Sequence, residues 1–470
     1  MEDADKQSFD TSTLFNKITP AAPTNLEQRA SDDIFLFGKL YSKKLLIALS
    51  VFILIALCAG AFFLLQSPAE ETKERVSIAP GEKFDFAIIT NYAALSNKYG
   101  ENYANNVLEK ATTLAKTVQE KDHLQSGVIL LDDQIHAAKY RFAKVNSKTE
   151  RDVARESLEQ AITATNASYV LIIGNDDIVP FRIISNPLAN DPDGAFEFIV
   201  QEDSKIYSDQ YKSISMGRLI DGHNGKANLT GMLDSAIALH DAANRASQIT
   251  FGKVVSNDSY GKFLSTIPIQ VTKQGEPIVS PPLVVFNFLD LAFDPFAKEQ
   301  VFKEIQNSKT NLVFIALHGN QGGQSQALSG HVSLDENEYL AMNAPLAQEY
   351  NYYGKLFVVD SCYGANPDRL ATGSIPITVM ERGAIGFIGA TSTALSNRKL
   401  FELENANEQN FLDAGAASTL TYYSMKEATN GARIGDALQN AKKKLDLNQP
   451  VNQLTYYQFQ LYGDPTLKLK

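Results

Sequence analysis

Cysteine is scarce in this chain of 470 residues, which contains two cysteines and no tryptophan. Cys58 lies inside a long apolar run, so Cys362 is the one cysteine of the remaining, mixed-polarity sequence. Without a second thiol after residue 65, that part cannot form an intramolecular disulfide, and no Cys-x-x-Cys pair offers a zinc site. The low cysteine content therefore excludes a disulfide-stabilised fold.

Closely spaced histidines, phosphate-binding loops and basic clusters are missing as well. Gly319, Gly322 and Gly323 are not followed by the Gly-Lys-Ser/Thr of a phosphate loop. The formal net charge of −11 opposes binding to a polyanionic backbone. The sequence therefore predicts neither metal catalysis nor a nucleic-acid partner. Beyond His318, the histidines are scattered without the short pairings of zinc sites: His123, His136, His223, His240 and His331.

One long apolar segment, residues 45–65, carries no charged side chain. As a helix rising ~1.5 Å per residue it would extend roughly 31 Å, enough to cross a bilayer core of about 30 Å. A cleavable signal peptide is the alternative, but its apolar region is usually shorter and begins nearer the amino terminus. The segment therefore predicts one transmembrane helix in contact with membrane lipid.

The basic residues that flank this segment predict its orientation. Lys39, Lys43 and Lys44 precede it, whereas Lys73 and Arg75 follow it among acidic residues. Basic residues near a span favour the cytoplasmic side. We therefore expect a single-pass membrane protein with a cytoplasmic amino terminus and an extracytoplasmic carboxyl-terminal part.

Composition and pattern predict a folded α/β protein after the apolar segment. The chain is 44% hydrophobic and 21% charged, which is typical of folded domains. Short runs rich in Val, Ile and Phe alternate with helical patterns, as in β-α units. We expect a disordered cytoplasmic tail over residues 1–43 and a linker over residues 66–80. Two α/β subdomains are expected to follow, an amino-terminal one over residues 82–245 and a carboxyl-terminal, catalytic one over residues 250–470.

The expected elements follow from the same patterns. The first subdomain is predicted to contain strands at 84–90, 128–131 and 169–173 and helices at 102–120 and 152–165. The second is predicted to contain helices near 298–307 and 432–445 and strands that end at Asn287, Leu317, Ser361 and Ala390.

His318 and Cys362 each stand just after an apolar run that is typical of a buried parallel strand. Open α/β sheets place their sites at the carboxyl ends of such strands. A thiol has a reference pKa of about 8.5 and becomes a strong nucleophile when a nearby base favours the thiolate, a role that a histidine can fill. The backbone N–H groups of Gly319 and Cys362 can face a tetrahedral oxyanion. The arrangement therefore indicates acyl transfer.

A structural interpretation of both residues stays open. A free cysteine is often buried, and a lone histidine often fills a structural role. The shared context of His318 and Cys362 favours the catalytic interpretation.

Several segments resemble the gingipain-type cysteine peptidases, a branch of the caspase-like clan. His-Gly at 318–319 and Asp-Ser-Cys-Tyr-Gly at 360–364 are similar to the family's catalytic dyad. The resemblance spans about residues 82–470 and implies a caspase/gingipain-like three-layer α/β sandwich of two subdomains. Further similar segments follow in the family's order, at 169–180, 208–211, 216–219, 383–392 and 459–467.

Carried over residue by residue, the resemblance implies a role for each residue of the dyad. Cys362 attacks the scissile carbonyl, His318 protonates the leaving amine, and the N–H groups of Gly319 and Cys362 form the oxyanion hole. The family also places a carboxylate behind the histidine, and Asp258, after an expected strand at 251–256, is the matching residue. The family residue is Glu, so Asp is a departure, and Asn-Asp-Ser is also an ordinary turn sequence.

The part of the sequence that matches the family's specificity segment departs from the arginine-specific members. Residues 265–273 contain no acidic side chain, so we do not expect a preference for arginine. Thr391, Ser392 and Thr393 follow the strand after the nucleophile and are expected to line the substrate pocket. Their uncharged side chains suit a small or neutral substrate residue, although these hydroxyls can also simply end the strand.

No cofactor is expected to be required, but a structural calcium ion is left open because gingipains bind calcium. The candidate ligands lie in an acidic segment whose irregular spacing is unlike an EF-hand and is more typical of a solvated loop. They are Asp191, Asp193, Glu197, Glu202 and Asp203.

The sequence therefore predicts a membrane-anchored cysteine endopeptidase that hydrolyses protein or peptide bonds through a thioester at Cys362. Two alternatives stay open. A sortase-like transpeptidase on the same fold would resolve the thioester with an amine instead of water. A non-catalytic, membrane-tethered binding module would keep the sheet for recognition, and its cysteine would resist a peptide electrophile.

Overall fold

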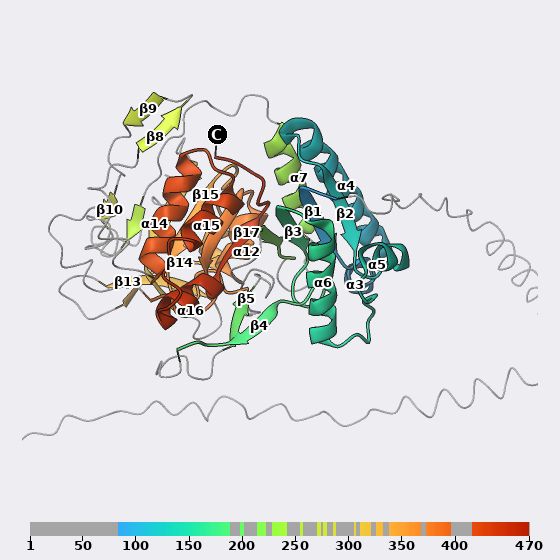
Figure 1. Cartoon of the computed structure of the whole chain (residues 1–470). Helices are drawn as coiled ribbons and strands as arrows, with labels where there is room; N and C mark the ends of the chain where they lie inside the picture. Colours follow the sequence, from blue (N-terminus) through green and yellow to red (C-terminus); the bar gives the residue numbers. More distant parts are fainter. Residues whose placement is uncertain are drawn as a thin grey trace, which may run out of the picture. The chain divides into compact units, whose positions relative to one another are not determined.

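A computed structural model describes much of the chain after residue 82 (Figure 1). The expected tail, apolar segment and linker lie outside the described residues, as do Asp258 and the five acidic calcium candidates. Within the described part, no helix is both long and apolar enough to cross a membrane. The described ranges are 83–188, 198–201, 214–221, 228–241, 254–256, 270–273, 276–279, 285–287, 305–306, 311–320, 326–331, 338–367, 373–395 and 416–469.

A ten-stranded sheet is the central element of residues 78–470, which form one compact unit. Its strand order is β10-β7-β11-β15-β16-β17-β6-β3-β1-β2. The earlier strands are β1 (Phe86–Thr90), β2 (Ser126–Leu130), β3 (Tyr169–Ile173) and β6 (Ser215–Leu219). The later ones are β7 (Val254–Ser256), β10 (Val285–Asn287), β11 (Leu312–Ala316), β15 (Leu356–Asp360), β16 (Gly386–Ala390) and β17 (Phe459–Gly463).

The two groups of strands repeat one arrangement. In the first group, ordered β2-β1-β3-β6, β1 lies between β2 and β3, the two strands that follow it in the chain. In the second group, ordered β10-β7-β11-β15-β16, β7 lies in the same way between β10 and β11. Neighbouring strands within these two runs are parallel, and β17 pairs antiparallel with β16. Tyr462 of β17 pairs with Arg218 of β6 and thereby joins the groups. Each run therefore has a point where the strand order reverses, next to its first strand.

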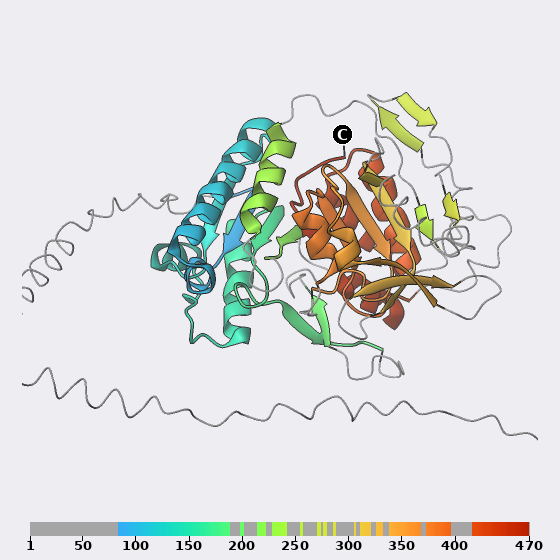
Figure 2. The same cartoon turned by 180° about the vertical axis from the view of Figure 1, so that it is seen from behind.

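Helices cover the sheet. They are α3 (Tyr92–Tyr99), α4 (Glu101–Asp122), α5 (Gln134–Tyr140), α6 (Arg151–Thr165), α7 (Leu229–Asp241), α11 (Ala344–Ala347), α12 (Ile375–Glu381), α14 (Ala416–Thr429), α15 (Ile434–Lys442) and α16 (Pro450–Gln458). In α4, the buried Val107, Ala111, Leu114 and Val118 recur at helical spacing and form one apolar face. Figure 2 shows α4 and α7 side by side from behind.

Strand alternation divides the core between the two faces of the sheet. Along β11, Val313 and Ile315 join one hydrophobic cluster, whereas Leu312, Phe314 and Ala316 join the other. Because successive strand residues point to opposite faces, a fully apolar strand must be covered on both. Helix α12 contributes to the first cluster, and α14 and α15 contribute to the second. This half of the sheet therefore forms the middle layer of a three-layer arrangement.

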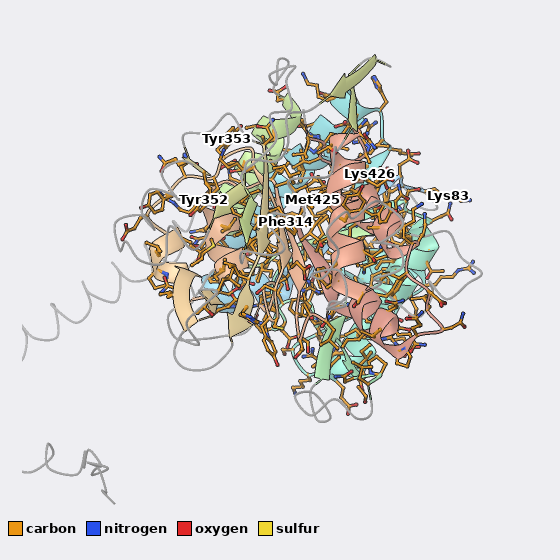
Figure 3. The ribbon with its side chains drawn as sticks, turned by 90° about the vertical axis from the view of Figure 1, so that its left-hand side faces the viewer. Lys83, Phe314, Tyr352, Tyr353, Met425 and Lys426 are labelled. Atoms are coloured by element: carbon orange, nitrogen blue, oxygen red, sulfur yellow. The ribbon has the colours of Figure 1, made fainter. Side chains whose placement is uncertain are left out.

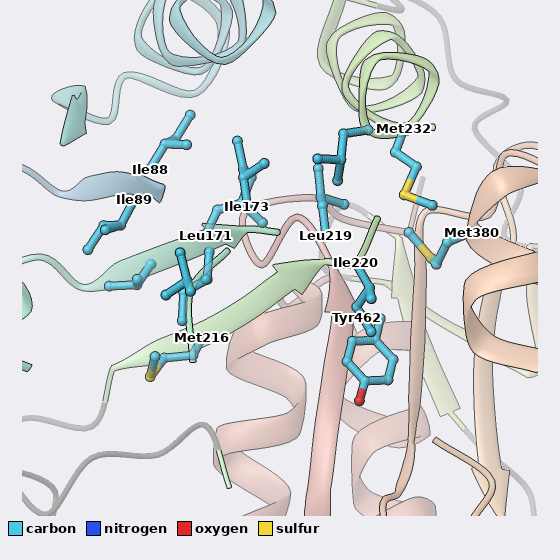
Figure 4. Close-up of a cluster of buried hydrophobic side chains, with 14 of the residues drawn as sticks. Ile88, Ile89, Leu171, Ile173, Met216, Leu219, Ile220, Met232, Met380 and Tyr462 are labelled. Carbon is cyan, nitrogen blue, oxygen red and sulfur yellow. The ribbon is translucent and has the colours of Figure 1, made fainter. Parts of the chain in front are cut away.

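The labelled side chains illustrate both clusters. Phe314 of β11 and Met425 of α14 belong to the second cluster and lie near the centre of Figure 3. The first cluster extends across β3, β6 and α7 to α12 and β17, and Leu219, Met232 and Met380 are drawn together in Figure 4. The earlier and later strands thus share a continuous buried core.

The observed elements agree with the expected ones to within a few residues at their ends. The expected strand at 84–90 begins at Phe86, and the helix at 102–120 extends over Glu101–Asp122. The helix at 152–165 is Arg151–Thr165, and the one at 432–445 is Ile434–Lys442. Of the helix near 298–307, the structure describes residues 305–306, which are helical.

Three small antiparallel sheets were not predicted. One consists of β12 (His318–Asn320), β13 (Ala327–His331) and β14 (Glu338–Asn343). The others are the pairs β4 (Arg182–Ser185) with β5 (Phe198–Gln201) and β8 (Gln270–Lys273) with β9 (Glu276–Val279). Their strands are short and carry no long apolar run, so the sequence gives little signal for them.

Candidate active site

Two neighbouring parallel strands carry the His-Gly and Ser-Cys segments. Ala316 of β11 is the register partner of Asp360 of β15, and the N–H of Leu317 donates to the Asp360 carbonyl over 3.3 Å. His318 and Cys362 each stand two residues beyond this register pair. Parallel pairing therefore brings both residues to the same edge of the sheet, as the sequence predicted.

Gly319 lies directly against the turn that carries the thiol. A Cβ added to Gly319 would collide with the backbone carbonyl group of Cys362 and would lie 2.6 Å from Ser361 Oγ. Only glycine permits this approach without a shift of the backbone. The His-Gly segment and the Ser-Cys segment are therefore in contact.

The turn after β15 holds Cys362 at the edge of the sheet. Tyr363 has a positive φ of 54°, which reverses the chain directly after the cysteine. Its N–H donates to the carbonyl of Ser392 over 2.8 Å, and the N–H of Ala365 donates to the carbonyl of Ala390 over 2.8 Å. The turn is thereby fastened to the end of β16, which leaves Cys362 half-buried.

The thiol of Cys362 points toward the segment that follows β16. Its Sγ lies 3.6 Å from the carbonyl oxygen of Ala394, to which a protonated thiol can donate weakly. The side chain of Thr393 reaches the same turn, because its Oγ1 donates to the phenol oxygen of Tyr363 over 3.3 Å. The segment that the sequence assigns to the substrate pocket is therefore next to the thiol.

The three residues expected to line that pocket are buried. The exposed fractions are 3% for Thr391, 3% for Ser392 and 8% for Thr393. The N–H of Thr391 donates to the Gln458 carbonyl over 3.0 Å, and Gln458 Nε2 donates to the Thr393 carbonyl over 3.0 Å. Gln458, the last residue of α16, thus holds the backbone of residues 391–393 in place.

The side chain of Gln326 also holds the turn after Cys362 in place. The sequence did not predict this role for Gln326. This buried side chain donates from Nε2 to the carbonyl of Tyr363, and its Oε1 accepts from the N–H of Ile375 over 2.8 Å. One amide therefore links the residue before β13, the turn after Cys362 and the first residue of α12. Glutamine occurs in no recognisable motif here, so the sequence offers no signal for this role.

His318 is exposed and begins the short strand β12, where its register partner is Ser329. Asp258 lies outside the described residues, but the preceding strand β7 is placed. Ser256, the last residue of β7, is the register partner of Ala316 in β11. The carboxyl ends of β7 and β11 therefore lie side by side, next to the point where the strand order reverses.

No group of three or more His, Cys, Asp or Glu side chains is placed to hold a metal ion within the ranges that the structure describes. The described part of the site has an exposed imidazole at the start of β12, a half-buried thiol and the backbone of the turn after β15. This set of groups can perform nucleophilic acyl transfer.

The sequence profile described as Peptidase family C25 matches residues 80–470. No curated protein matches the chain. Among solved structures, the crystal structure of the Arg-specific cysteine proteinase gingipain R (RGPB) is 11% identical, with a TM-score of 0.50 over 84% of this chain and 80% of that one.

A second solved structure is the complex of Porphyromonas gingivalis RgpB pro- and mature domains. It is 12% identical, with a TM-score of 0.49 over 82% of this chain and 79% of that one. At such identities the likeness to gingipain R shows the fold alone, whereas the family profile covers far more than half of the sequence. The resemblance stated from the motifs is therefore confirmed, and the chain belongs to peptidase family C25.

Proposed function

We propose that this protein is a membrane-anchored cysteine endopeptidase that hydrolyses protein or peptide substrates outside the cytoplasm. The observation that carries the proposal is the contact between Gly319 and the backbone of Cys362. It joins the His-Gly segment of β12 to the Ser-Cys turn at one sheet edge, where a base and a nucleophile can act on one bond.

The reaction starts with proton transfer from the Cys362 thiol to the imidazole of His318. The thiolate attacks the carbonyl carbon of the scissile bond, so that a C–S bond forms and the carbonyl oxygen becomes an oxyanion. The imidazolium donates its proton to the leaving nitrogen as the C–N bond breaks. Water then attacks the thioester, which releases the carboxylate product and restores the thiol.

Backbone N–H groups of Gly319 and Cys362 are the proposed oxyanion donors. Preorganised donors of this kind contribute roughly 2.7–4 kcal/mol of transition-state stabilisation each. The close approach at Gly319 supports the assignment, because it holds both turns in one fixed relation before substrate binds.

Asp258 is the proposed carboxylate behind His318. The register of β7 with β11 supports this assignment, since Ser256 lies beside Ala316 at the edge from which His318 follows. A carboxylate at that edge would orient the imidazole and stabilise its protonated form.

The segment at 391–393 is the proposed wall of the substrate pocket. Its contact with Tyr363 and the direction of the Cys362 sulfur toward Ala394 support this role. Because its side chains carry hydroxyls and no charge, we propose a preference for small or neutral substrate residues.

The apolar segment at 45–65 is the proposed membrane anchor, with the amino terminus in the cytoplasm. Its lack of charge and its length support this assignment. Full-length protein should then stay with membranes through an alkaline carbonate wash, and deletion of residues 45–65 should release it. Release of the full-length protein by the wash would contradict the anchor.

A peptidyl chloromethyl ketone with alanine at the reactive position tests the dyad directly. We expect the reagent to alkylate Cys362, and we expect His318→Ala to slow the reaction by roughly 100-fold because the thiolate loses its base. His123→Asn is the matched control, because His123 is an exposed histidine outside the site.

Lack of labelling at Cys362, or equal rates in the two histidine variants, would contradict the dyad and favour a binding module. Labelling combined with ligation of an added amine to a donor peptide would identify the transpeptidase instead.

A further inference from the structure

A cavity beside the first half of the sheet takes no part in the proposed peptidase site. It encloses about 370 Å³, within the range of small-molecule pockets. Three connections line it: the one after β1, the one between α5 and α6, and the one after β3. Among its lining residues are Asn91, Asn97, Lys98, Asn146, Thr149 and Asp177.

The position of this cavity in the fold is that of a ligand site. In the order β2-β1-β3-β6, β2 lies on one side of β1 and the next strand of the chain, β3, lies on the other, so the strand order reverses between β1 and β3. Open parallel sheets bind ligands outside the carboxyl ends of the strands at such a reversal. The segments after β1 and β3 both contribute to the cavity, and the equivalent reversal in the second half, between β7 and β11, is where His318 follows β11.

The two sites are separate. Strands β3 and β15 are four strand spacings apart in the sheet order, which corresponds to about 19 Å. All lining residues fall within residues 91–180, whereas the hydrogen-bond partners described above for the Cys362 turn lie at residue 326 and beyond. The inference that follows is therefore independent of the proposed peptidase activity.

The first turn of α3 faces the cavity but offers no free anion site. The N–H groups of Tyr92 and Ala93 donate to the two oxygens of Asp132 over 2.8 and 2.9 Å. The N–H of Ala94 donates to Asn91 Oδ1 over 3.0 Å. A carboxylate already occupies the place where a phosphate would sit at a helix amino terminus, so this cavity does not suit an anion.

The cations at the cavity are already neutralised. Lys98 Nζ lies 2.5 Å from Asp221 Oδ2 and 2.7 Å from Asp177 Oδ2. Arg151, at the start of α6, pairs with Asp176. Lys98 therefore faces two carboxylates, whereas Arg151 is balanced by Asp176.

Of the two carboxylates that face Lys98, Asp177 is the accessible one. Asp221 is buried, and it also accepts from the Tyr99 hydroxyl and the Asn175 N–H, both over 2.5 Å. Asp177 differs, since its side chain is 46% exposed and Lys98 is its one charged partner within the described residues. Asn97 and Thr149 also line the cavity, and their amide and hydroxyl oxygens can accept N–H donors.

We propose that this cavity binds a small organic cation, an ammonium or guanidinium group, with Asp177 as the charged contact. The group enters beside Lys98 and donates to the second oxygen of Asp177 and to the neutral acceptors around it. The cation comes either from a free amine or from a basic side chain of a peptide.

The test uses the full chain with Cys362→Ala, so that no peptide can be cleaved. Isothermal titration calorimetry compares 1,5-diaminopentane with a blocked pentapeptide that has lysine between alanines. The glutamine analogue of that peptide and inorganic phosphate are the neutral and anionic probes. Binding of the diamine alone identifies a free amine, and binding of the lysine peptide identifies a basic side chain.

Asp177→Asn should weaken binding of the cationic probe at least roughly tenfold, because it removes the charge and keeps the shape. Asn97→Lys, at an exposed lining position, should abolish binding by repulsion. Asp234→Asn is the matched control, since Asp234 is 56% exposed and pairs with Lys110 over 2.5 Å away from the cavity. The proposal fails if neither cation binds, if phosphate or the glutamine peptide binds equally well, or if Asp234→Asn weakens binding as much as Asp177→Asn.

Discussion

At the scale of single residues, Gly319 constrains the candidate site most tightly. Its Cα approaches the Cys362 carbonyl so closely that a methyl group cannot be accommodated. The position therefore couples the geometry of the histidine segment to that of the thiol.

Gly319→Ala should separate the two turns. We expect a loss of roughly 1–3 kcal/mol in the free energy of unfolding, because the methyl group must displace backbone. Peptide cleavage should fall by at least roughly 100-fold, because the oxyanion donors and the base move relative to the thiol. Urea unfolding and kcat/KM measure the two effects.

Gly231→Ala is the control for that substitution. Gly231 lies within α7, and an added Cβ there meets nothing within 4 Å. We expect stability to rise by about 0.5–1 kcal/mol, as for Gly to Ala in a helix, with activity unchanged. Equal activity in the Gly319→Ala variant and this control would contradict the role given to the Gly319 contact.

The sequence allowed His318 and Cys362 to be predicted at one sheet edge, because apolar runs ending in Gly or polar residues mark the ends of buried strands. It did not allow the left-handed turn at Tyr363 to be predicted, since a non-glycine residue with positive φ has no local signature. The complete burial of Arg218 was equally unpredictable, because its partners are backbone carbonyls of Gly174 and Val179 on another connection.

At the scale of elements, the nucleophile turn is held by parts of the chain that are distant in sequence. Gln326 joins the turn to α12, and the end of β16 accepts from Tyr363 and Ala365. These contacts depend on the order and register of the strands. Apolar runs in the sequence predict where strands lie along the chain, but they do not predict order or register. The existence of the strands could thus be predicted, while the attachment of the turn could not.

Gln326→Met should lower activity without abolishing folding. The substitution removes both hydrogen bonds and leaves the Tyr363 carbonyl and the Ile375 N–H without this partner, at a cost of roughly 1–3 kcal/mol in stability. We expect kcat to fall by roughly tenfold or more while KM changes little, because the thiol is displaced and the pocket wall at 391–393 keeps its attachment to Gln458 of α16.

Gln453→Met on α16 is the comparison for Gln326→Met. Gln453 Nε2 donates to the Leu447 carbonyl over 2.7 Å outside the site. Kinetic constants close to those of the unmodified protein are expected there. A rise in KM with an unchanged kcat in Gln326→Met would show that Gln326 serves substrate binding instead of positioning the thiol.

At the scale of the whole molecule, a buried cluster joins the end of α4, the end of α7 and the chain after β17. His240 lies between Asp122, 2.6 Å from Nδ1, and Asp464, 3.0 Å from Nε2. Arg433 Nη1 lies 3.1 Å from Asp122 Oδ1, and Thr466 Oγ1 lies 3.3 Å from His240 Nε2. Segments from both halves of the chain therefore meet at one histidine.

The free energy of unfolding is expected to depend on pH, because His240 has a different pKa in the folded and unfolded protein. Burial by itself would lower the pKa of His240, but hydrogen bonds from its ring to Asp122 and Asp464 outweigh burial and raise the pKa above 6.5. A raised folded-state pKa stabilises the protein fully below 6.5, and this stabilisation is lost as pH rises through the folded-state value.

Urea unfolding midpoints between about pH 6 and about pH 9 should therefore fall with rising pH, and His240→Asn should flatten that dependence. His136 provides a contrast of opposite sign. Burial lowers the pKa of His136, whose Nδ1 accepts from the Leu130 N–H over 3.0 Å, so its contribution is lost as pH falls through the lowered value. If the urea midpoint of His240→Asn falls between about pH 6 and about pH 9 as much as that of the unmodified protein, the role given to the His240 cluster is contradicted.

The most direct measurement of the central claim is cleavage of a diverse peptide library by the full chain under reducing conditions. We predict that the unmodified protein cuts, that Cys362→Ala and His318→Ala each abolish cutting, and that His123→Asn does not. The cut sites should carry small or neutral residues on their amino-terminal side. Cleavage that persists in Cys362→Ala would contradict the account, because the thioester at that sulfur is its essential step.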